Sequence, residues 1–206
     1  DATGVEDTRV IDIRGSAFIR VEDLMVKGAR LVTPSGGFRS SAGANVQYSG
    51  AVDFVRCTFT DNNIAYSGAD SINFGSGIAF VSARGTVSEC VFTNLTSTQA
   101  GTGNSQKCLG GAVSAFKCAI DVDRCVIRDN SFSGGSSGGG GRCYGAVTTL
   151  GFWTGDESNV RNCLIANNKM GGASNANVYS PSGRQYFSQG LTMTRGSVVN
   201  CTIVSN

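Results

Sequence analysis

The sequence predicts an all-β protein, a right-handed parallel β-helix of about six coils, and two observations lead to this prediction. The first is a repeat: a short segment with a central cysteine recurs at intervals of 33, 35, 38 and 38 residues, at Cys57, Cys90, Cys125, Cys163 and Cys201. The second is composition, because 29 glycines among 206 residues favour a β-rich chain with many tight turns over a helical one. Near-constant repeats of this length are typical of solenoids, in which each repeat forms one coil.

Each cysteine repeat is interpreted as one strand that bends into the next around a narrow core. The cysteine and the residue two places later are both apolar and should point to the same side, since side chains alternate along a strand. A polar residue precedes each cysteine and is expected to point outward at a corner. A sixth copy without cysteine, Val21-Glu22-Asp23-Leu24-Met25, is placed 34 residues upstream of Cys57.

Asparagine follows four of the five cysteines at a distance of five residues: Asn62, Asn130, Asn168 and Asn206. Leu95 takes this place in the remaining copy. Asparagine tolerates left-handed backbone angles and hydrogen-bonds to its own backbone, so it is expected to form a sharp corner. Stacked at the repeat period, these residues would form a ladder of side-chain amides. The alternative is that they only mark turns.

A strand of small residues is expected before each cysteine copy, and the clearest one is Gly110-Gly111-Ala112-Val113. Its counterparts are Ala44-Asn45-Val46, Ser76-Gly77-Ile78-Ala79, Tyr144-Gly145-Ala146-Val147 and Gln189-Gly190-Leu191-Thr192. A coil is therefore expected to contain this strand, a second strand, the cysteine strand, the asparagine corner and a variable return loop. The return loops at 96–109, 131–143 and 169–189 should lie on one edge of the solenoid, where insertions into repeats gather.

These motifs resemble the polymorphic outer membrane protein repeats of bacterial surface adhesins, whose signature pairs GGA[ILV] with FxxN. GGAV occurs at 110–113 and FxxN at Phe59-Thr60-Asp61-Asn62, with relaxed copies that begin at Ile127, Ile165 and Ile203. The coil pattern is also similar to that of pectate-lyase-like β-helix domains. The first resemblance implies a surface module with a structural or adhesive role. The second implies a polysaccharide-active enzyme, either a lyase or a glycoside hydrolase.

Residues 1–206 are expected to form a single β-helix segment, part of a longer secreted or cell-surface protein. A solenoid needs caps, and no amphipathic capping helix is visible in the sequence, so flanking coils or a capping partner is expected. The net charge is only +2 and no basic cluster occurs, which argues against nucleic-acid binding. Membrane insertion is not expected either, because no apolar run approaches the ~20 residues that span a bilayer.

Eight cysteines fall into two groups. The five repeat cysteines are expected to be free buried thiols, because stacked side chains point alike and cysteine behaves as a small apolar residue. Cys108 and Cys143 lie just before the small-residue strands of adjacent coils, and we predict a disulfide between them. A bound metal or cofactor is not expected, since the chain has no histidine and no CxxC pair. Two segments match the N-glycosylation pattern, Asn94-Leu95-Thr96 and Asn200-Cys201-Thr202, although asparagine-rich turns also produce such matches by chance.

The candidate binding residues are aromatic. Trp153, the only tryptophan, lies in a four-residue expansion at 151–157, and Tyr179 and Tyr186 lie in the last return loop. An aromatic side chain on a protruding turn can stack on a sugar or fill a partner's pocket. The expected partner is therefore a polysaccharide or a surface protein. The alternative is that Trp153 folds back over an exposed strand.

The enzyme alternative would depend on carboxylates, because the chain lacks the histidine of Ser-His-Asp and Cys-His sites. Its candidate residues are Asp53, Asp121, Asp123 and Arg124. Asp53 and Asp121 should lie on one face about 9–10 Å apart, a separation near that of glycosidase carboxylates. Lyase chemistry would add Ca²⁺. A cleft with convergent aspartate and arginine would favour the enzyme, and a flat polar face with an aromatic patch would favour binding. The simplest interpretation of these acidic and basic residues is that they are solvent-exposed polar side chains on the outer face of a sheet.

Overall fold

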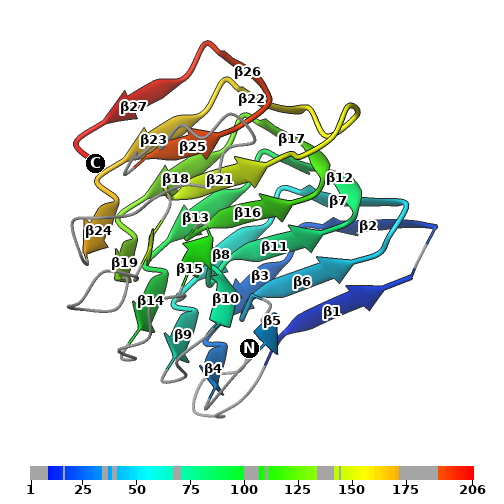
Figure 1. Cartoon of the computed structure of the whole chain (residues 1–206). Coiled ribbons are helices and arrows are strands. Elements are labelled where there is room, and N and C mark those ends of the chain that lie inside the picture. The colour runs from blue at the N-terminus through cyan, green and yellow to red at the C-terminus, as the bar shows by residue number, and fades with distance from the viewer. Residues whose placement is uncertain are drawn as a thin grey trace.

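The predicted all-β fold is confirmed by the architecture of the protein, a parallel β-solenoid (Figure 1). The computed structural model describes residues 9–15, 17–33, 37–38, 41–66, 71–99, 107–109, 111–133, 142–143, 145–171 and 190–206. Within this part all regular elements are β-strands, and they stack in five parallel sheets. These residues include no helix that is long and apolar enough to cross a membrane.

Three sheets of six strands form the main tube of the solenoid. The first sheet contains β1 (Ile11–Arg14), β6 (Ala44–Gln47), β11 (Ile78–Val81), β16 (Val113–Phe116), β21 (Val147–Leu150) and β25 (Leu191–Met193). The second contains β2 (Phe18–Glu22), β7 (Ala51–Val55), β12 (Arg84–Ser88), β17 (Ala119–Asp123), β22 (Ser158–Arg161) and β26 (Gly196–Val199). The third contains β3 (Met25–Lys27), β8 (Thr58–Thr60), β13 (Val91–Thr93), β18 (Val126–Arg128), β23 (Leu164–Ala166) and β27 (Thr202–Val204).

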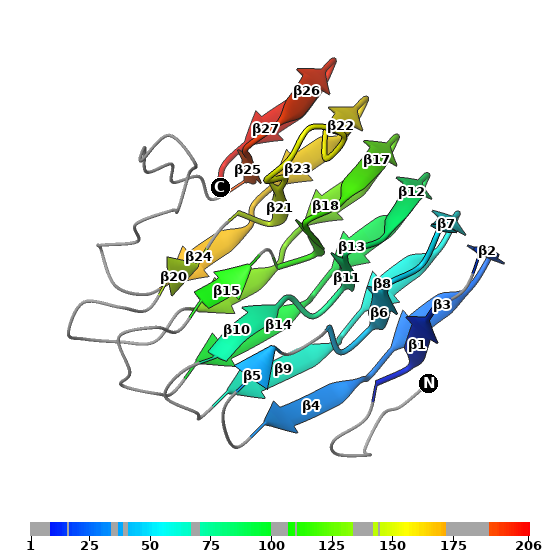
Figure 2. The same cartoon turned by 45° about the vertical axis from the view of Figure 1, so that its right-hand side comes forward.

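Two further sheets extend the coils on one side, as Figure 2 shows. The fourth contains β4 (Arg30–Thr33), β9 (Asn63–Tyr66), β14 (Thr96–Gln99), β19 (Ser131–Ser133) and β24 (Lys169–Gly171). The fifth contains β5 (Gly37–Phe38), β10 (Ser71–Phe74), β15 (Lys107–Leu109) and β20 (Arg142–Cys143). The return segments, predicted as loops, are thus partly strand. In the described part, four coils contribute a strand to all five sheets, a fifth contributes to four and a sixth to three.

Except where β21 and β25 lead into the second sheet, each turn at the three corners of the solenoid contains a residue with left-handed backbone, φ 48–75°. At the first corner, between the first and second sheets, these are Gly15, Tyr48, Ser82 and Lys117. At the second corner, which leads into the third sheet, they are Asp23, Arg56, Glu89, Arg124, Asn162 and Asn200. At the third corner, which leads into the fourth sheet, they are Gly28, Asp61, Asn94, Asp129, Asn167 and Ser205. One such residue turns the chain sharply, and the next side chain points inward.

The repeat cysteines form the predicted column on the inner side of the second corner. Four of them are buried, Cys201 on the last coil is half-buried, and all five are free thiols. Each sulfur lies between carbonyl oxygens of its own and the preceding coil, as with Cys90, 3.2 Å from Ser88 and 3.6 Å from Phe54. The N–H of Cys57 also donates to Cys90 Sγ at 3.4 Å. The column is therefore satisfied without disulfides.

The predicted register of the sixth copy is wrong by one residue. Glu22 pairs with Val55 and Met25 with Thr58, so Leu24, and not Asp23, occupies the cysteine position of the first coil. The cause is chemical, because a carboxylate is costly to bury whereas leucine is not. Asp23 instead takes the outward corner position. There it forms a bidentate ion pair with Arg56, at 2.6 and 2.7 Å.

The predicted amide ladder is present over the last three coils. Asn130 donates to Asn168, and Asn168 to Asn206, each at 2.8 Å. Leu95 interrupts the ladder, and Asn62 bonds instead to the backbone of the first coil. The left-handed residue is the one before each of these asparagines, so the expectation that asparagine itself adopts that angle is wrong. Its side chain is needed inside, where it satisfies backbone groups.

Two of the predicted small-residue strands are also shifted by one residue. Ile78 pairs with Val113, and Leu191 with Val147, so the inward apolar side chain sets the register. Glycine directly precedes Ile78 and Leu191 because the coil is crowded there. A Cβ on Gly77 would clash with the backbone carbonyl of Ala112.

Most of the large apolar side chains that remain exposed lie on the first and last coils of the described part. They are Phe18, Leu24, Met25 and Val32 on the first coil and Val198, Val199, Ile203 and Val204 on the last. Within the described part, each of these two coils has a neighbouring coil on one side only, which leaves the other side of these residues uncovered. A capping partner or flanking coils would cover them, and this stays a prediction.

Candidate functional site

The first corner departs from its repeat on the fifth coil. The strand pairings align Phe116 with Leu150 and Asp121 with Asn159, so the six residues 151–156 replace Lys117 and Cys118 at this corner, which confirms the four-residue expansion. The Asp156 carboxylate holds this turn by accepting the N–H groups of Phe152 at 2.9 Å and Trp153 at 3.1 Å. The turn therefore has a defined shape.

Aromatic packing fixes the base of the turn. Phe152 contacts Phe116 edge-on with ring centroids 5.3 Å apart, and Phe116 contacts Phe74 in the same way at 6.1 Å. These rings belong to a second hydrophobic cluster, with Val81 and Leu150, on the outer face of the first sheet. Anchored in this way, the turn leaves Trp153 58% exposed.

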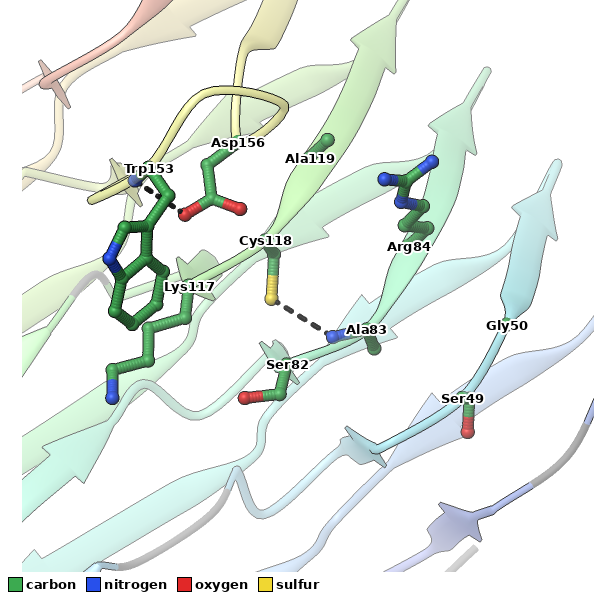
Figure 3. A pocket seen from close by; sticks show the side chains of 10 residues that line it. All are labelled: Ser49, Gly50, Ser82, Ala83, Arg84, Lys117, Cys118, Ala119, Trp153 and Asp156. Carbon is green, nitrogen blue, oxygen red and sulfur yellow. Dashed lines mark hydrogen bonds between the residues drawn. The ribbon is translucent and has the colours of Figure 1, made fainter.

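Lys117 lies next to the exposed tryptophan. Its Nζ is 5.0 Å from the centroid of the Trp153 ring, which Figure 3 shows beside it, and 5.6 Å from the centroid of the Phe116 ring. At these distances the ring quadrupole attracts the ammonium group. Among the described residues, no carboxylate forms an ion pair with Lys117. A cation and an aromatic face are thus presented together.

A hollow of about 570 Å³ lies along the first corner next to this turn (Figure 3). It is lined by Ser49, Gly50, Ser82, Ala83, Arg84, Lys117, Cys118, Ala119, Trp153 and Asp156. A second hollow, of about 360 Å³, lies over the outer face of the second sheet and includes Asp53, Thr86, Asp121, Glu157 and Asn159. Arg84 and Ala119 line both hollows, so the two adjoin. We call the combined depression the trough.

The floor of the second hollow belongs to a row of polar side chains that runs along the solenoid. The strand pairings align Arg20, Asp53, Thr86, Asp121, Asn159 and Ser197. Every member is polar, and neighbouring strands are about 4.8 Å apart. We call this row the polar column. Asp53 and Asp121 stand two strands apart with Thr86 between them, the register that the repeat predicts.

The four candidate residues of the enzyme alternative divide into two places. Asp53 and Asp121 both line the trough, where Asp121 accepts the Asn159 amide at 2.7 Å and lies 3.4 Å from Arg161. The side chain of Asp53 forms no hydrogen bond or ion pair with any other described residue. Asp123 and Arg124 pair with each other near the second corner, and Arg124 also bonds Glu89 at 3.0 Å. The structure thus brings one pair together and keeps the other outside the trough.

The remaining predicted site residues lie wholly or partly outside the part of the chain that the structure describes. Tyr179 and Tyr186 lie outside the described residues. The backbones of Cys108 and Cys143 pair directly across β15 and β20, while their side chains lie outside the described part. The disulfide stays a prediction, with the two backbones in register.

Arg84 and Lys117 are the site residues that the sequence analysis missed. Neither stands out locally, since each is a single basic residue in a chain whose basic residues are scattered. The alignment of the repeats could have revealed Lys117. It occupies the first corner of the coil directly before the expansion, so aligning the corners of successive coils would have placed it beside Trp153.

Cys118 lies at the base of the first hollow (Figure 3). Its sulfur accepts the N–H of Ala83 at 3.3 Å and is 3.0 Å from the carbonyl of Phe116. Burial raises the pKa of this thiol to about 11. The group is therefore protonated at neutral pH and is a poor nucleophile.

Among the described residues, no three histidine, cysteine, aspartate or glutamate side chains are arranged to hold a metal ion. Comparison with known proteins finds no matching family model, no similar curated protein and no similar solved structure. The resemblance to surface-adhesin repeats and pectate-lyase-like domains therefore extends to the parallel β-solenoid alone.

Proposed function

We propose that the chain is an extracellular or cell-surface β-solenoid module that binds a polysaccharide in the trough and along the polar column. The observation that carries this proposal is the anchored, exposed Trp153 beside an open trough with a polar floor. The structural and adhesive role implied by the repeat resemblance agrees with it, because a rigid solenoid can present such a surface.

The shape of the polar column suits a linear ligand. It offers one hydrogen-bonding side chain per coil at a rise of about 4.8 Å, comparable to the length of one pyranose residue in an extended chain. Trp153 supplies a flat apolar face for the C–H groups of a sugar ring. Asp53 and Thr86 supply acceptors and a donor for its hydroxyl groups.

A protein ligand fits this surface less well. Stable protein interfaces bury about 800 Å² per partner around a desolvated cluster of apolar anchors. Among the residues that line the trough, Trp153 is the one large apolar side chain that is strongly exposed. Protein binding thus remains the weaker form of the proposal.

A polysaccharide-cleaving enzyme is the second candidate, and the position of Asp53 and Asp121 in one trough favours it. Their separation of about two strand spacings is near the range that inverting glycosidases use to hold a water between carboxylates. In this reading the two carboxylates act as general acid and general base on either side of the bond that is cleaved. A release of reducing ends that Asp53→Asn abolishes would establish this activity.

The proposal is tested by affinity electrophoresis of the protein through gels that contain individual polysaccharides. At least one polysaccharide should retard the protein, and Trp153→Ala should weaken its binding at least about tenfold, since stacked aromatic anchors dominate such sites. The matched control is Tyr48→Ala, because Tyr48 is 69% exposed at the same corner but does not line the trough. Binding that is unchanged in Trp153→Ala, or absent throughout a panel of neutral and charged polysaccharides, would contradict the proposal.

A further inference from the structure

The third corner carries one asparagine whose side chain is unlike the others there. Asn94 is exposed at the turn between β13 and β14, with φ 53°. The next residue, Leu95, is fully buried and fixes the turn by donating its N–H to Asn130 Oδ1 at 2.9 Å. Because Leu95 points inward, the Asn94 side chain points outward, away from the core.

The Asn94 amide is not engaged within the described structure. Other surface asparagines bond to a neighbouring coil, as Asn159 does to Asp121 at 2.7 Å and Asn167 to Asp129 at 3.3 Å. No hydrogen bond joins the Asn94 side chain to another described residue, and the same holds for the Thr96 hydroxyl. Asn94-Leu95-Thr96 is therefore an acceptor sequence whose asparagine amide and threonine hydroxyl form no hydrogen bond with another described residue.

The second acceptor sequence serves as an internal comparison. Asn200 is also exposed at a left-handed corner, but its amide donates to Asn162 Oδ1 at 2.8 Å. A glycan on Asn200 would compete with this bond, whereas a glycan on Asn94 displaces no described contact. The two asparagines are both exposed, and they differ in that only the Asn200 amide donates a hydrogen bond to another described residue.

We infer that Asn94 is an N-glycosylation site, an inference that rests on the extracellular location in the proposed function. The donor is an oligosaccharide linked to a lipid pyrophosphate. Asn94 Nδ2 forms a bond to the anomeric carbon, the bond from that carbon to the pyrophosphate oxygen breaks, the lipid pyrophosphate leaves and Nδ2 loses one proton. The third corner lies on the opposite side of the solenoid from the first corner (Figure 1), so the glycan leaves the trough open.

The test is secretion of the chain, behind a signal peptide, from a eukaryotic cell, followed by peptide-N-glycosidase treatment and peptide mass spectrometry. The wild type should carry a glycan on Asn94 and shift in mobility on treatment. Asn94→Gln and Thr96→Ala should abolish that shift, Thr96→Ser should keep it, and Asn200→Gln should leave it unchanged. Thr96→Ala guards against misfolding, because it removes the acceptor sequence without altering the left-handed residue.

A secreted, folded wild type without a glycan on Asn94 would overturn the inference. Polysaccharide binding is measured on unglycosylated protein made in bacteria, so the two proposals fail separately. Glycosylated protein that binds no polysaccharide contradicts only the proposed function. Unglycosylated secreted protein that binds polysaccharide contradicts only the glycosylation site.

Discussion

The first and second corners of the solenoid are built on the same backbone device, yet their surfaces differ. At the second corner the outward side chains largely satisfy one another, with Asp23 bonded to Arg56, Glu89 to Arg124 and Asn200 to Asn162. At the first corner Lys117 and the adjacent Arg84 form no ion pair with a described residue, and an inserted turn presents Trp153. A corner that repeats without insertion stabilises the stack, whereas a corner that breaks its repeat leaves groups free for a ligand.

The two corners also differ in the residues that point into the core. The second corner places a cysteine column in the core, with its sulfurs between backbone carbonyls. At the first corner the equivalent places hold Ser49, Ala83 and Cys118, which also line the trough. The inward position of the second corner is therefore expected to tolerate few residue types, and that of the first corner to tolerate more. Substitutions at the two corners should differ in their effect on stability.

The largest effect is expected for a charge placed in the cysteine column. Cys125→Asp should lower the free energy of unfolding by at least about 3 kcal/mol. Cys125 is buried between two coils, so the new carboxylate would be buried without a positive charge beside it. Ser82→Asp, at the exposed left-handed position of the first corner, is the control and should change it little. Denaturant unfolding measures both, and equal losses would remove the distinction between the corners.

A pH-dependent effect of intermediate size is expected at Cys118. Because its folded pKa is about 11, above the ordinary value of 9.0, the folded state retains a proton that the unfolded state loses. The contribution of Cys118 to stability should be constant below pH 9 and decline as the pH rises from about 9 to about 11. Cys118→Ala, which copies Ala83 on the neighbouring coil, should abolish this decline. Denaturant midpoints of the two proteins over that range test the effect, and parallel curves would contradict it.

The smallest effect is expected in the charged row of the second corner. Arg124→Ala removes ion pairs to Glu89 and Asp123, but the guanidinium is exposed and solvent screens such pairs. The midpoint of thermal unfolding and polysaccharide binding should both stay nearly unchanged. A marked loss of binding would move the site to the second corner, as the enzyme alternative with Asp123 and Arg124 requires.

The fold followed from the sequence because its core repeats. Cys57, Phe59 and their equivalents recur in the same order in each coil, and a buried column tolerates few residue types. The predicted register was wrong where the cysteine is missing. In the first coil Leu24 takes the cysteine position, and because this copy has no cysteine to align on, the sequence analysis placed it one residue too early. The asparagine corner was placed correctly and its backbone angle was assigned to the wrong residue, since sequence does not separate a turn residue from its inward neighbour.

The trough could be predicted only in part, because it is assembled across coils. Trp153 was visible as a lone tryptophan in an expanded corner, and Asp53 and Asp121 as aligned acids. Their proximity to Lys117 and Arg84 depends on how the corners stack, which a single repeat does not encode. The exclusion of Asp123 and Arg124 likewise depends on the ion pairs they form with each other and with Glu89.

We expect the ligand to lie along the first corner and the polar column. The most direct measurement is amide chemical-shift mapping by NMR during titration with a polysaccharide that retards the protein. Shifts should concentrate at Trp153, Lys117 and Arg84 and continue through Asp53 and Thr86, with little change at Arg124. Shifts confined to the second corner, or scattered without relation to the trough, would contradict the account.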